Sequence, residues 1–364
     1  MTPRRTDEPE GWEVRDTRST WIKVVGVGGG GGNAVQRMRS LALDGVELVA
    51  INTDAQALEA VNVPHKLLLG KTVTGGRGAG GNPDKGRAAA LESHEEIADL
   101  IGHTHLLFIT TTLGGGTGSG AAPIVADIAR DLGLLTLGIV TRPFRWEGER
   151  RRDYAKEAIL QLQEKIDALA IISNDRLMEL PEAQNLPLPD AFYLADETLR
   201  KGVQGISDLL LKRGMVNRDL ADIEAILRGA KRILLGTGEA SGKDRAEAAT
   251  RQALFSPLLE ESPLGARHVL LNLTCGEDFT MNEMTKVVEI VRRETVNVDL
   301  PEPTMMWGAT LDPQMHDRLR VTLLATGQTK AKPANAPIKV TQQKIPWEDD
   351  EGIDLSPFRL ERFQ

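Results

Sequence analysis

The sequence has 364 residues, of which 41% are hydrophobic and 26% are charged, and this length allows two domains with cores of their own. The net charge is −8, and no cluster of basic residues indicates nucleic acid as a main partner. No apolar stretch approaches the ~18 residues of a membrane span, and residues 1–20 lack the apolar core of a signal peptide. The one cysteine, Cys275, excludes an intrachain disulfide framework and is expected to be a small core residue. We therefore expect a cytoplasmic protein with no direct membrane insertion.

The N-terminal half alternates apolar stretches with helical patterns after a polar arm, residues 1–20, that is expected to be disordered. The predicted strands are residues 22–27, 47–51, 106–110 and 134–140, and the predicted helices are residues 33–43, 83–101 and 121–129. Pro123 is expected in the first turn of the last helix, where a missing N–H costs little. This alternation is typical of a parallel sheet covered on both faces, which binds ligands at the carboxyl ends of its strands.

A long helix is predicted over residues 191–211, because apolar residues from Phe192 to Leu210 recur at steps of three and four. After it, strands at 232–235, 268–273, 304–307 and 320–325 alternate with helical segments such as 282–295. The sequence therefore predicts a first α/β domain at 21–190, a bridging helix at 191–212 and a smaller second α/β domain at 213–327.

The last residues divide by composition into two segments. Residues 328–344 contain four lysines, two prolines and no acid, which is typical of a flexible linker. Residues 345–364 place apolar side chains, such as Trp347 and Phe358, within a charged terminus. This pattern favours a peptide that becomes ordered on a partner, although a frayed end would also be compatible with it.

Two glycine-rich runs follow predicted strands and would lie at the ligand-binding edge of the sheet. Gly26, Gly28 and Gly31 have the spacing G-x-G-x-x-G, and the next strand ends near Asp54, as in dinucleotide-binding proteins. The second run, Gly114–Gly120, has five glycines with Thr117 and Ser119 and precedes a predicted helix. A strand, a glycine-rich segment and a helix N-terminus together present converging backbone N–H groups, most often to phosphate.

The first run alone leaves both a flexible turn and an NAD site open. The second run, with a third glycine-rich turn at Gly78–Pro83, favours a triphosphate, because three loops could surround a longer phosphate chain. Gly238–Asp244 is one residue short of the Walker spacing and has an acid where the magnesium-binding hydroxyl belongs, so we expect a surface turn there. Residues 141–151 also follow a strand. Glu147 could accept hydrogen bonds from ribose hydroxyls and an arginine could neutralise phosphates, but the spacing alone favours a charged surface loop.

An acidic pair opens the predicted helix that follows the long one. Asn217 is a suitable N-cap, and Asp219 and Asp222 share one face of the first turn. The two carboxylates could orient a water and accept its proton, or contact a metal, but acids in a first turn also stabilise the helix dipole without another role. A helix of about twenty residues spans ~30 Å, so this pair could reach a nucleotide at its far end only on another subunit.

With these motifs in place, the sequence resembles the FtsZ family, the bacterial tubulin-like cell-division GTPases, from about Trp21 to Gly327. Gly114–Gly120 matches the signature loop of that family, and Asn217–Ile223 is similar to its catalytic loop. The other nucleotide loops are matched by Gly26–Asn33, Asn52–Asp54, Gly78–Pro83 and Pro143–Gly148. Leu220 stands where the family usually has Phe, the linker is short, and Asp354–Arg359 is a reordered form of the adaptor-binding peptide.

The resemblance implies the tubulin/FtsZ fold: a Rossmann-like parallel-sheet GTPase domain, a long central helix and a smaller α/β C-terminal domain. It implies GTP or GDP as the ligand, with Mg²⁺ but no assigned metal-binding residue. It also implies a head-to-tail homopolymer at the division site and adaptor proteins that bind the C-terminal peptide, residues 345–364. A non-dividing paralogue and, more remotely, a NAD-dependent oxidoreductase are the alternatives.

The resemblance also implies residue roles. Catalysis is assigned to Asp219, Asp222 and Asn217, which would act on the GTP of the neighbouring subunit. The ribose contact is assigned to Glu147, with Arg151 nearby in the nucleotide site, and guanine contacts to Asn33, Asn174, Phe192 and Asp196. The remaining nucleotide contacts, mainly to phosphates, are Gly28, Gly29, Gly30, Gly31, Asp54, Gly80, Gly114, Gly115, Gly116, Thr117, Gly118, Ser119 and Gly120.

Overall fold

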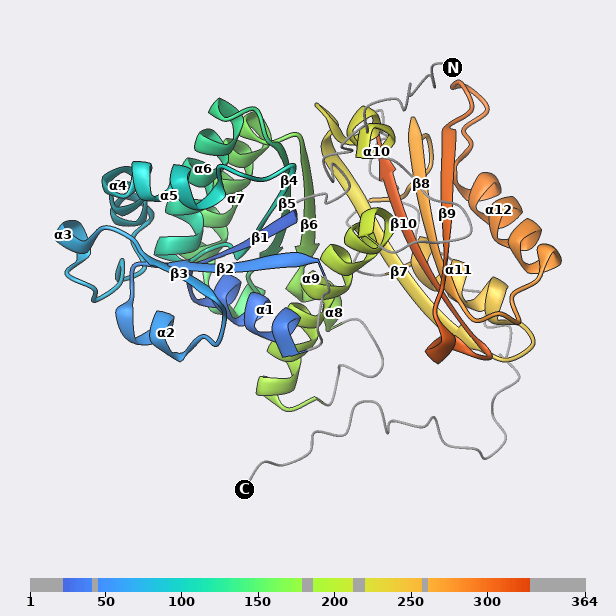
Figure 1. The fold of residues 1–364 in the computed structure, drawn as a ribbon, viewed down its shortest axis with the longest axis horizontal. Helices are drawn as coiled ribbons and strands as arrows, with labels where there is room; N and C mark the ends of the chain where they lie inside the picture. The colour runs from blue at the N-terminus through green and yellow to red at the C-terminus, as the bar shows by residue number, and fades with distance from the viewer. Residues whose placement is uncertain (1–21, 41–44, 179–185, 212–219, 257–260, 328–364) are drawn as a thin grey trace, which may run out of the picture. The chain divides into compact units, whose positions relative to one another are not determined.

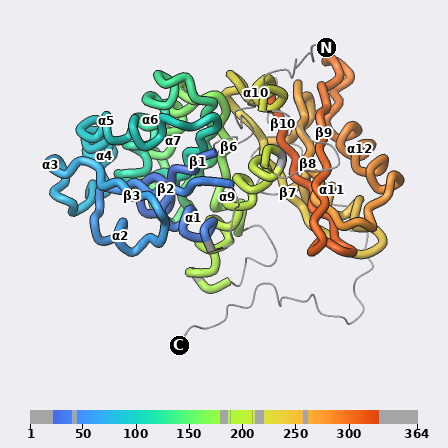
Figure 2. The backbone as a smooth tube through the Cα atoms, in the orientation of Figure 1, coloured from blue at the N-terminus to red at the C-terminus, as the bar shows by residue number. Residues whose placement is uncertain are grey.

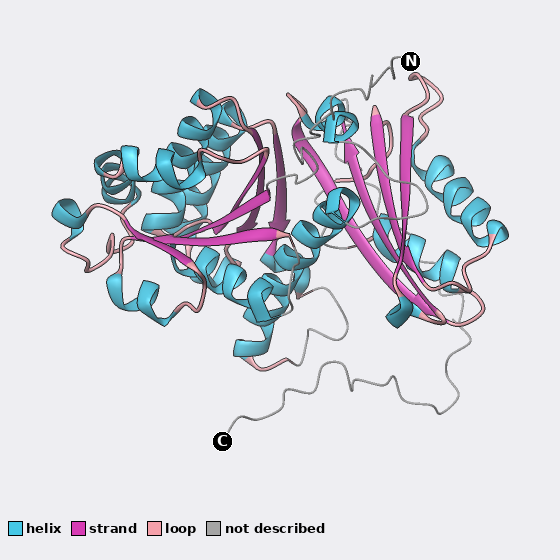
Figure 3. Cartoon of the chain, viewed as in Figure 1, coloured by secondary structure: helices cyan, strands magenta, loops and turns pink. Residues whose placement is uncertain are grey.

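A computed structural model describes residues 22–40, 45–178, 186–211, 220–256 and 261–327, all within one compact unit (Figure 1). The described strands form one ten-stranded sheet in the order β3-β2-β1-β4-β5-β6-β7-β10-β8-β9 (Figure 3). No helix in these ranges is long and apolar enough to cross a membrane. The backbone path shows two groups of strands and helices joined by α9 (Leu188–Leu211), which lies between them (Figure 2).

The first six strands in the sheet order are parallel, as expected for the Rossmann-like parallel sheet of the first predicted domain. They are β3 (His65–Leu68), β2 (Val46–Asn52), β1 (Ile22–Val27), β4 (Leu106–Thr112), β5 (Leu135–Arg142) and β6 (Ala168–Ser173). The chain winds outward in opposite directions from β1 and β4, so the strand order switches between them. A crevice at such a switch point is where open α/β sheets bind ligands.

Helices cover both faces of this parallel part, because its strands are apolar on both sides. One core contains residues of α1 (Gly28–Ser40), α2 (Ala55–Ala60), α9 and α10 (Leu220–Leu227). The core on the other face contains residues of α4 (Pro83–Glu92), α5 (His94–Ile101), α6 (Gly116–Asp131) and α7 (Glu149–Lys165). The short elements α3 (Lys71–Thr74), η1 (Arg145–Glu147) and α8 (Asn174–Leu177) follow strand ends at the ligand-binding edge.

The remaining four strands form the mixed part of the same sheet, called the mixed sheet below. β10 (Arg318–Thr326) is antiparallel to β7 (Lys231–Ser241) and β8 (His268–Cys275), and β9 (Thr304–Leu311) is parallel to β8. A third core lies between these strands and the helices α11 (Arg245–Leu254) and α12 (Met281–Thr295), and the short η3 (Pro313–Met315) precedes β10. β7 pairs with β6 over three residues only, Lys231–Ile233 with Ala168–Ala170.

The long helix α9 packs closely on this mixed sheet through two glycines. A Cβ atom on Gly202 would lie 2.5 Å from a methyl group of Leu235, and one on Gly205 would lie 2.4 Å from a methyl group of Thr322. Leu199 and Val203 are fully buried in the core that α9 shares with the parallel strands. The predicted bridging helix is therefore confirmed, and its glycines set its distance from β7 and β10.

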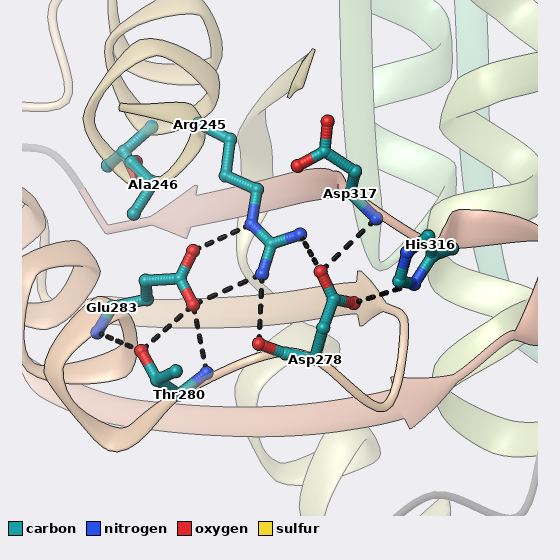
Figure 4. Close-up of polar contacts among 8 residues, drawn as sticks. Arg245, Ala246, Asp278, Thr280, Glu283, His316 and Asp317 are labelled. Atoms are coloured by element: carbon teal, nitrogen blue, oxygen red, sulfur yellow. Dashed lines mark hydrogen bonds and ion pairs between the residues drawn. The ribbon is translucent and has the colours of Figure 1, made fainter. Parts of the chain in front are cut away.

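A buried ion cluster fixes one end of the mixed sheet (Figure 4). Arg245 is the first residue of α11 and is 4% exposed. Its guanidinium donates to Glu283 of α12 at 2.6 Å and to Asp278 at 2.5 Å. Glu283 also completes the capping box of α12 with Thr280. This cluster therefore joins the N-termini of two helices that are nearly forty residues apart in the sequence.

Several predicted boundaries are wrong for identifiable reasons. The helix expected over residues 83–101 is two helices, because the backbone of Ser93 (φ −97°, ψ 21°) departs from helical geometry; the Ser93 hydroxyl accepts the Gly70 N–H at 3.0 Å. The helices expected from Asn33 and Ala121 begin earlier, at Gly28 and Gly116, so most of each glycine run is helical. Pro123 accordingly lies inside α6 rather than in its first turn.

Two smaller predictions have mixed outcomes. Cys275 is fully buried in the third core, as expected, and its burial raises the pKa of its thiol to about 11. The segment Gly238–Asp244 is only partly a turn, because Gly238–Ser241 belongs to β7 and pairs with β10. The turn itself is confined to the residues from Gly242, which has a positive φ of 80°.

Candidate nucleotide site

Three helix N-termini meet at the crevice between β1 and β4, and glycines let them approach. α1 begins at Gly28, α6 begins at Gly116 and α4 begins at Pro83. A Cβ on Gly28 would lie 3.0 Å from the Gly118 nitrogen, and one on Gly86 would lie 2.3 Å from the Gly116 oxygen. Side chains at these positions would force the helices apart, so the glycines are needed for the convergence of three positive dipole ends.

The predicted phosphate-binding glycines fall into two groups. Gly30, Gly31, Gly118 and Gly120 face protein, since a Cβ on each would lie within 2.0–2.5 Å of a neighbouring oxygen atom. By contrast, a Cβ on Gly29, Gly80 or Gly115 would meet no heavy atom within 4 Å. The second group leaves backbone open to a ligand, while the first group serves close packing.

The N-terminus of α6 has the features of an anion site. Gly115 is its N-cap residue and provides no side-chain hydrogen bond to the first turn. The first N–H groups of a helix have no intrahelical acceptor, so here they are directed toward the space beside Gly115. A phosphate in that space would receive these N–H groups together with the positive end of the helix dipole. The residues present therefore fit the triphosphate that the sequence predicts.

Three hydrogen bonds from four hydroxyl side chains hold this backbone in place. Thr53 and Thr117 share a hydrogen bond of 2.6 Å between their hydroxyls, which joins the ends of β2 and the start of α6. The Ser119 hydroxyl accepts the Gly114 N–H at 2.8 Å, and Thr111 donates to the Val27 carbonyl at 2.8 Å. The Ser119 side chain thus stabilises the turn into α6. Its predicted contact with phosphate remains a prediction.

Asp54 lies at the same edge, as the N-cap of α2, and its carboxylate accepts the Ala57 N–H at 3.0 Å. A Cβ on Gly78 would lie 3.5 Å from the other carboxylate oxygen, so the acid and the third glycine-rich turn are neighbours. The predicted assembly of three glycine-rich segments at one edge is therefore found. The contact of Asp54 with a nucleotide stays a prediction.

The predicted ribose residues lie beside the second glycine run. The Glu147 side chain is 7% exposed, accepts the Phe144 N–H at 2.9 Å and forms an ion pair with Arg151. A Cβ on Gly114 would lie 2.9 Å from the Arg151 carbonyl oxygen, so this part of α7 contacts the turn into α6. The segment after β5 is thus tied to the site rather than being a detached surface loop.

An aromatic cluster connects η1 with the start of α9. Phe144 is buried and stacks on Trp146 with ring centroids 5.1 Å apart, and Phe192 meets Phe144 edge-on at 5.6 Å. The Phe192 side chain is still 38% exposed. A ring that is held on one side and open on the other is suited to stacking on a purine base.

An ion pair connects α9 with α1. Arg37 lies 3.0 Å from the Asp196 carboxylate and stacks over the Tyr193 ring at 4.3 Å. Burial of Asp196 raises the pKa of its carboxyl to about 6, and the charge of Arg37 opposes this rise. Asn33 is exposed one helical turn before Arg37, so the predicted base-binding residues Asn33 and Asp196 come from two helices in contact.

Asn174, the fourth residue predicted to contact guanine, opens α8 and is 1% exposed. Its side-chain oxygen is buried and has no hydrogen-bond partner among the described residues. The adjacent Asp175 accepts the Arg145 N–H at 2.8 Å and so joins α8 to η1. An unsatisfied amide at this edge is consistent with a ligand that donates a hydrogen bond there.

The predicted catalytic residues are only partly described. Asn217 and Asp219 lie outside the described residues. Asp222 lies in the first turn of α10, which follows α9 in the sequence. The stretch of α9 from Phe192 to Leu211 alone corresponds to roughly 29 Å of helix axis.

The sequence interpretation missed two features of this site. Arg37 was not singled out, although it is four residues from Asn33 and therefore shares its helix face. The pairing of Thr53 with Thr117 had no local signal, because it joins residues 64 positions apart. The described residues contain no group of three or more His, Cys, Asp or Glu side chains placed to hold a metal ion.

Family comparisons agree with this topology. The sequence model of the family described as "Tubulin/FtsZ family, GTPase domain" matches residues 21–182, and that of the "FtsZ family, C-terminal domain" matches residues 232–329.

Solved structures give the same assignment. An empty FtsZ dimer from M. jannaschii is 41% identical, with a TM-score of 0.80 over 86% of this chain and 90% of that one. At 20% identity, CetZ2 from Haloferax volcanii, a protofilament with GTPγS bound, has a TM-score of 0.72 over 86% of this chain and 94% of that one. At 19% identity, CetZ1 from the same organism, a GDP-bound monomer, has a TM-score of 0.74 with coverages of 86% and 96%. The two CetZ proteins show similarity of fold alone.

Proposed function

Because this chain belongs to the FtsZ family, we propose that it is a GTP-hydrolysing filament protein of cell division whose catalytic site is shared between successive subunits. In this proposal GTP binds at the crevice between β1 and β4. The uncapped N-terminus of α6 beside the open Gly115 is the observation that carries the nucleotide assignment. Mg²⁺ would be held mainly by phosphate oxygens and water, because the described residues offer no cluster of metal ligands.

The proposed nucleotide contacts follow the geometry of the edge. The phosphates would lie against the backbone of Gly29, Gly80 and Gly115, where a Cβ would meet nothing. The ribose would lie near Glu147 and Arg151, and the base near Phe192, Asp196, Asn33 and the unsatisfied amide of Asn174.

The length of α9 supports catalysis between subunits. The proposed base contacts lie near the start of α9, whereas Asp222 comes after its C-terminal end in the sequence. Asn217 and Asp219 lie between the end of α9 and Asp222 in the sequence. If the next subunit stacks in the same orientation, its acidic pair would face the phosphates and one carboxylate would accept a proton from the attacking water. Such a heterologous contact does not close on itself and produces a filament. Loss of the γ-phosphate would then weaken the contact that holds the subunits together.

The proposed organisation is a GTP-binding domain over residues 21–190, a central helix over 191–212 and an activating domain over 213–327. The linker over 328–344 and the peptide over 345–364 would connect the filament to adaptor proteins at the division site. A non-dividing filament protein of the same superfamily would have the same site. Depletion followed by microscopy separates the two, because only loss of a division protein gives filamentous cells without septa.

A complementation experiment tests the shared site directly. Asp222→Ala keeps the nucleotide edge intact and should bind GTP without hydrolysing it. Gly115→Asp places a carboxylate at the N-cap of α6, where it would satisfy the first-turn N–H groups and exclude phosphate, so this variant should fold and fail to bind GTP. Each variant alone should be inactive.

An equal mixture of the two variants should recover turnover, since about a quarter of random head-to-tail contacts would join an intact nucleotide edge to an intact acidic pair. Gly115→Ala is the control for the backbone change at that position. A mixture as inactive as its components, or normal turnover by Asp222→Ala alone, would rule out the shared site.

A further inference from the structure

The acidic helix α10 comes after α9 in the sequence, but its apolar side chains belong to the core of the parallel strands. It lies between the two segments that the family models match, so neither model assigns it to a domain. The core that contains Leu135 of β5 and Ala168 of β6 also contains the buried residues of α10, which are Ile223, Ile226 and Leu227. The core beneath α11 and α12 contains no described residue of α10. The packing of α10 therefore connects it to the strands that carry the nucleotide edge.

One carboxylate joins the end of α10 to these strands. Asp167 directly precedes β6, and its side chain is 17% exposed. One carboxylate oxygen accepts the Thr136 N–H of β5 at 2.9 Å, and the other accepts the Gly229 N–H at 3.3 Å. Gly229 is the second residue after α10. The two oxygens of one side chain therefore bridge β5 and the end of α10.

The backbone of Asp167 holds the same connection. Its N–H donates to the Thr136 carbonyl at 3.1 Å, and its carbonyl accepts the Lys231 N–H at 2.7 Å. Gly229 and Lys231 have positive φ angles of 71° and 62°. A residue other than glycine rarely adopts such an angle and keeps it only where its surroundings hold it. The connection from α10 to β7 is thus fixed in one conformation by its contacts with Asp167.

The ion pair of Asp167 contributes less than these backbone contacts. The Arg228 guanidinium lies 4.0 Å from the Asp167 carboxylate, and its side chain is 48% exposed. The same guanidinium donates to Glu224 of α10 at 2.7 Å. A half-exposed ion pair adds little to stability, whereas a carboxylate that accepts backbone N–H groups forms charge-assisted hydrogen bonds. The two N–H groups therefore account for most of the effect of Asp167 on α10.

Asp167 lies at the edge of the sheet opposite the nucleotide edge. It precedes the first residue of β6, and Thr136 is the second residue of β5, so both are at the amino ends of parallel strands. The nucleotide crevice is at the carboxyl ends of the same sheet. Asp222, in the first turn of α10, is therefore connected through Asp167 to the strands that position the GTP of its own subunit.

We propose that Asp167 is a positioning residue for hydrolysis in the neighbouring subunit. It holds the end of α10 at the amino ends of β5 and β6 and so fixes where Asp222 meets the GTP of the next subunit. This inference rests on the proposed shared site. Without both acceptor oxygens the end of α10 would shift, and a small misplacement of a catalytic group costs a large factor in rate. GTP binding to the same subunit would be unaffected.

Three variants test the role of the two oxygens. Asp167→Asn has the same size but one acceptor oxygen, so the N–H of Thr136 or Gly229 would face an amide that cannot accept it. This variant should keep its GTP affinity and its KM within about twofold and lose about tenfold or more in kcat. Asp167→Glu retains two acceptors and should recover part of the turnover. Asp127→Asn is the control: it removes the same charge from an ion pair with Lys165 of 3.1 Å, which does not involve α10, and should keep full turnover.

Mixtures of variants separate positioning from a general folding defect. Asp167→Asn mixed with Gly115→Asp should recover turnover, because GTP bound to the first would meet the intact α10 of the second. Asp167→Asn mixed with Asp222→Ala should stay inactive, because neither provides a competent α10. Recovery in neither mixture, or in the second alone, would overturn the proposal. If Asp222→Ala mixed with Gly115→Asp also fails to recover, the shared site itself is refuted and this inference with it.

Hydrogen exchange gives a test that does not depend on a folded variant. The Gly229 amide lies beyond the end of α10, and in the unaltered chain its hydrogen bond to Asp167 should protect it from exchange. In Asp167→Asn, exchange at Gly229 and Ile226 should become faster, while exchange at Gly120 of α6 should not change. An unprotected Gly229 amide in the unaltered chain would overturn the proposal, whatever the variants do.

Discussion

Arg37 and Asp196 form an ion pair of 3.0 Å that joins the helix starting in the first glycine run to the long helix α9. Asp196 is buried, and this burial outweighs the charge of Arg37, so the pKa of the carboxyl is raised to about 6. The site therefore contains an acid that is costly to ionise in the absence of ligand. The cost is consistent with an acid retained for recognition of a ligand rather than for stability.

Asp196→Asn should stabilise the ligand-free protein at neutral pH. The folded-state pKa lies above the unfolded value of 3.8, so the folded state holds a proton that the unfolded state has lost between about pH 4 and pH 6. Stability of the unaltered protein should therefore fall as pH rises through this window, and the variant should not show that contribution. From pH 4.5 to pH 7.5, the free energy of unfolding of the variant relative to that of the unaltered protein should rise by on the order of 2–3 kcal/mol. Urea unfolding at both pH values measures it, and an equal difference at both would contradict the assignment.

Gly29 and Gly31 should respond differently to the same substitution. A Cβ on Gly31 would lie 2.5 Å from the Thr110 carbonyl oxygen, so Gly31→Ala should force α1 from β4 and destabilise the fold by about 1–3 kcal/mol. A Cβ on Gly29 meets nothing, so Gly29→Ala should fold at least as well, since alanine favours helix. If phosphate occupies that open space, Gly29→Ala should still weaken GTP binding. Thermal unfolding and nucleotide titration of the two variants separate packing from binding; equal melting temperatures would refute the packing argument.

Removal of Arg245 should destabilise the mixed sheet and leave the nucleotide edge intact. Arg245→Leu would leave the partly exposed carboxylates of Glu283 and Asp278 without their cation and remove the ion pairs that join α11 to α12, so the variant should unfold at a lower denaturant concentration (Figure 4). A double variant, Arg245→Leu with Glu283→Leu, should recover part of the loss, because the remaining charge is also removed. Chemical unfolding measures the effect, and GTP binding is the control. An unchanged midpoint in the single variant would show that the cluster does not support the fold.

The same cluster should contribute to acid sensitivity. The hydrogen bond from Arg245 lowers the pKa of Glu283 below its ordinary value of 4.5. A depressed folded-state pKa gives stability that is present above about pH 4.5 and is lost as pH falls through the folded value. Acid unfolding of the unaltered chain should therefore begin at lower pH than that of Glu283→Gln. If the two proteins unfold at the same acid pH, the hydrogen bond to Glu283 does not contribute to acid stability.

Turnover per subunit should rise with protein concentration and then level off, because each proposed catalytic site needs two subunits. Asp222→Ala provides the baseline at every concentration. Sedimentation of the same samples should show that turnover follows assembly. Constant turnover per subunit down to concentrations at which nothing sediments would show that a single chain is sufficient.

Eight of the ten described strands were predicted from sequence, because their residues are apolar in short runs with polar boundaries, whereas β3 and β6 were not predicted. β1 was placed to the residue at Ile22–Val27. The glycine runs were placed at the correct edge but were expected to be loops. Propensity disfavours glycine in a helix, and here the close approach of Gly86 to Gly116 and of Gly31 to Thr110 overrides it.

The contacts that complete the site could not be derived in this way. The Ser93 hydroxyl accepts the N–H of Gly70, which is 23 residues away, and no local pattern reveals such a partner. Likewise, the pairing of Arg37 with Asp196 joins helices far apart in the chain, although the helical period placed each residue on a defined face. Sequence periodicity therefore predicted which side chains share a surface but not which surfaces meet.

The ladder between β6 and β7 has three residue pairs, whereas β7 shares nine with β10. If the proposed filament were stretched across this seam, so few backbone pairs would resist separation weakly. The helix α9 contacts β7 through Gly202 and β10 through Gly205 and would support the seam. We therefore expect such a stretched subunit to yield first between Ala170 and Ile233, which would open the core that contains both residues and leave the other two cores intact.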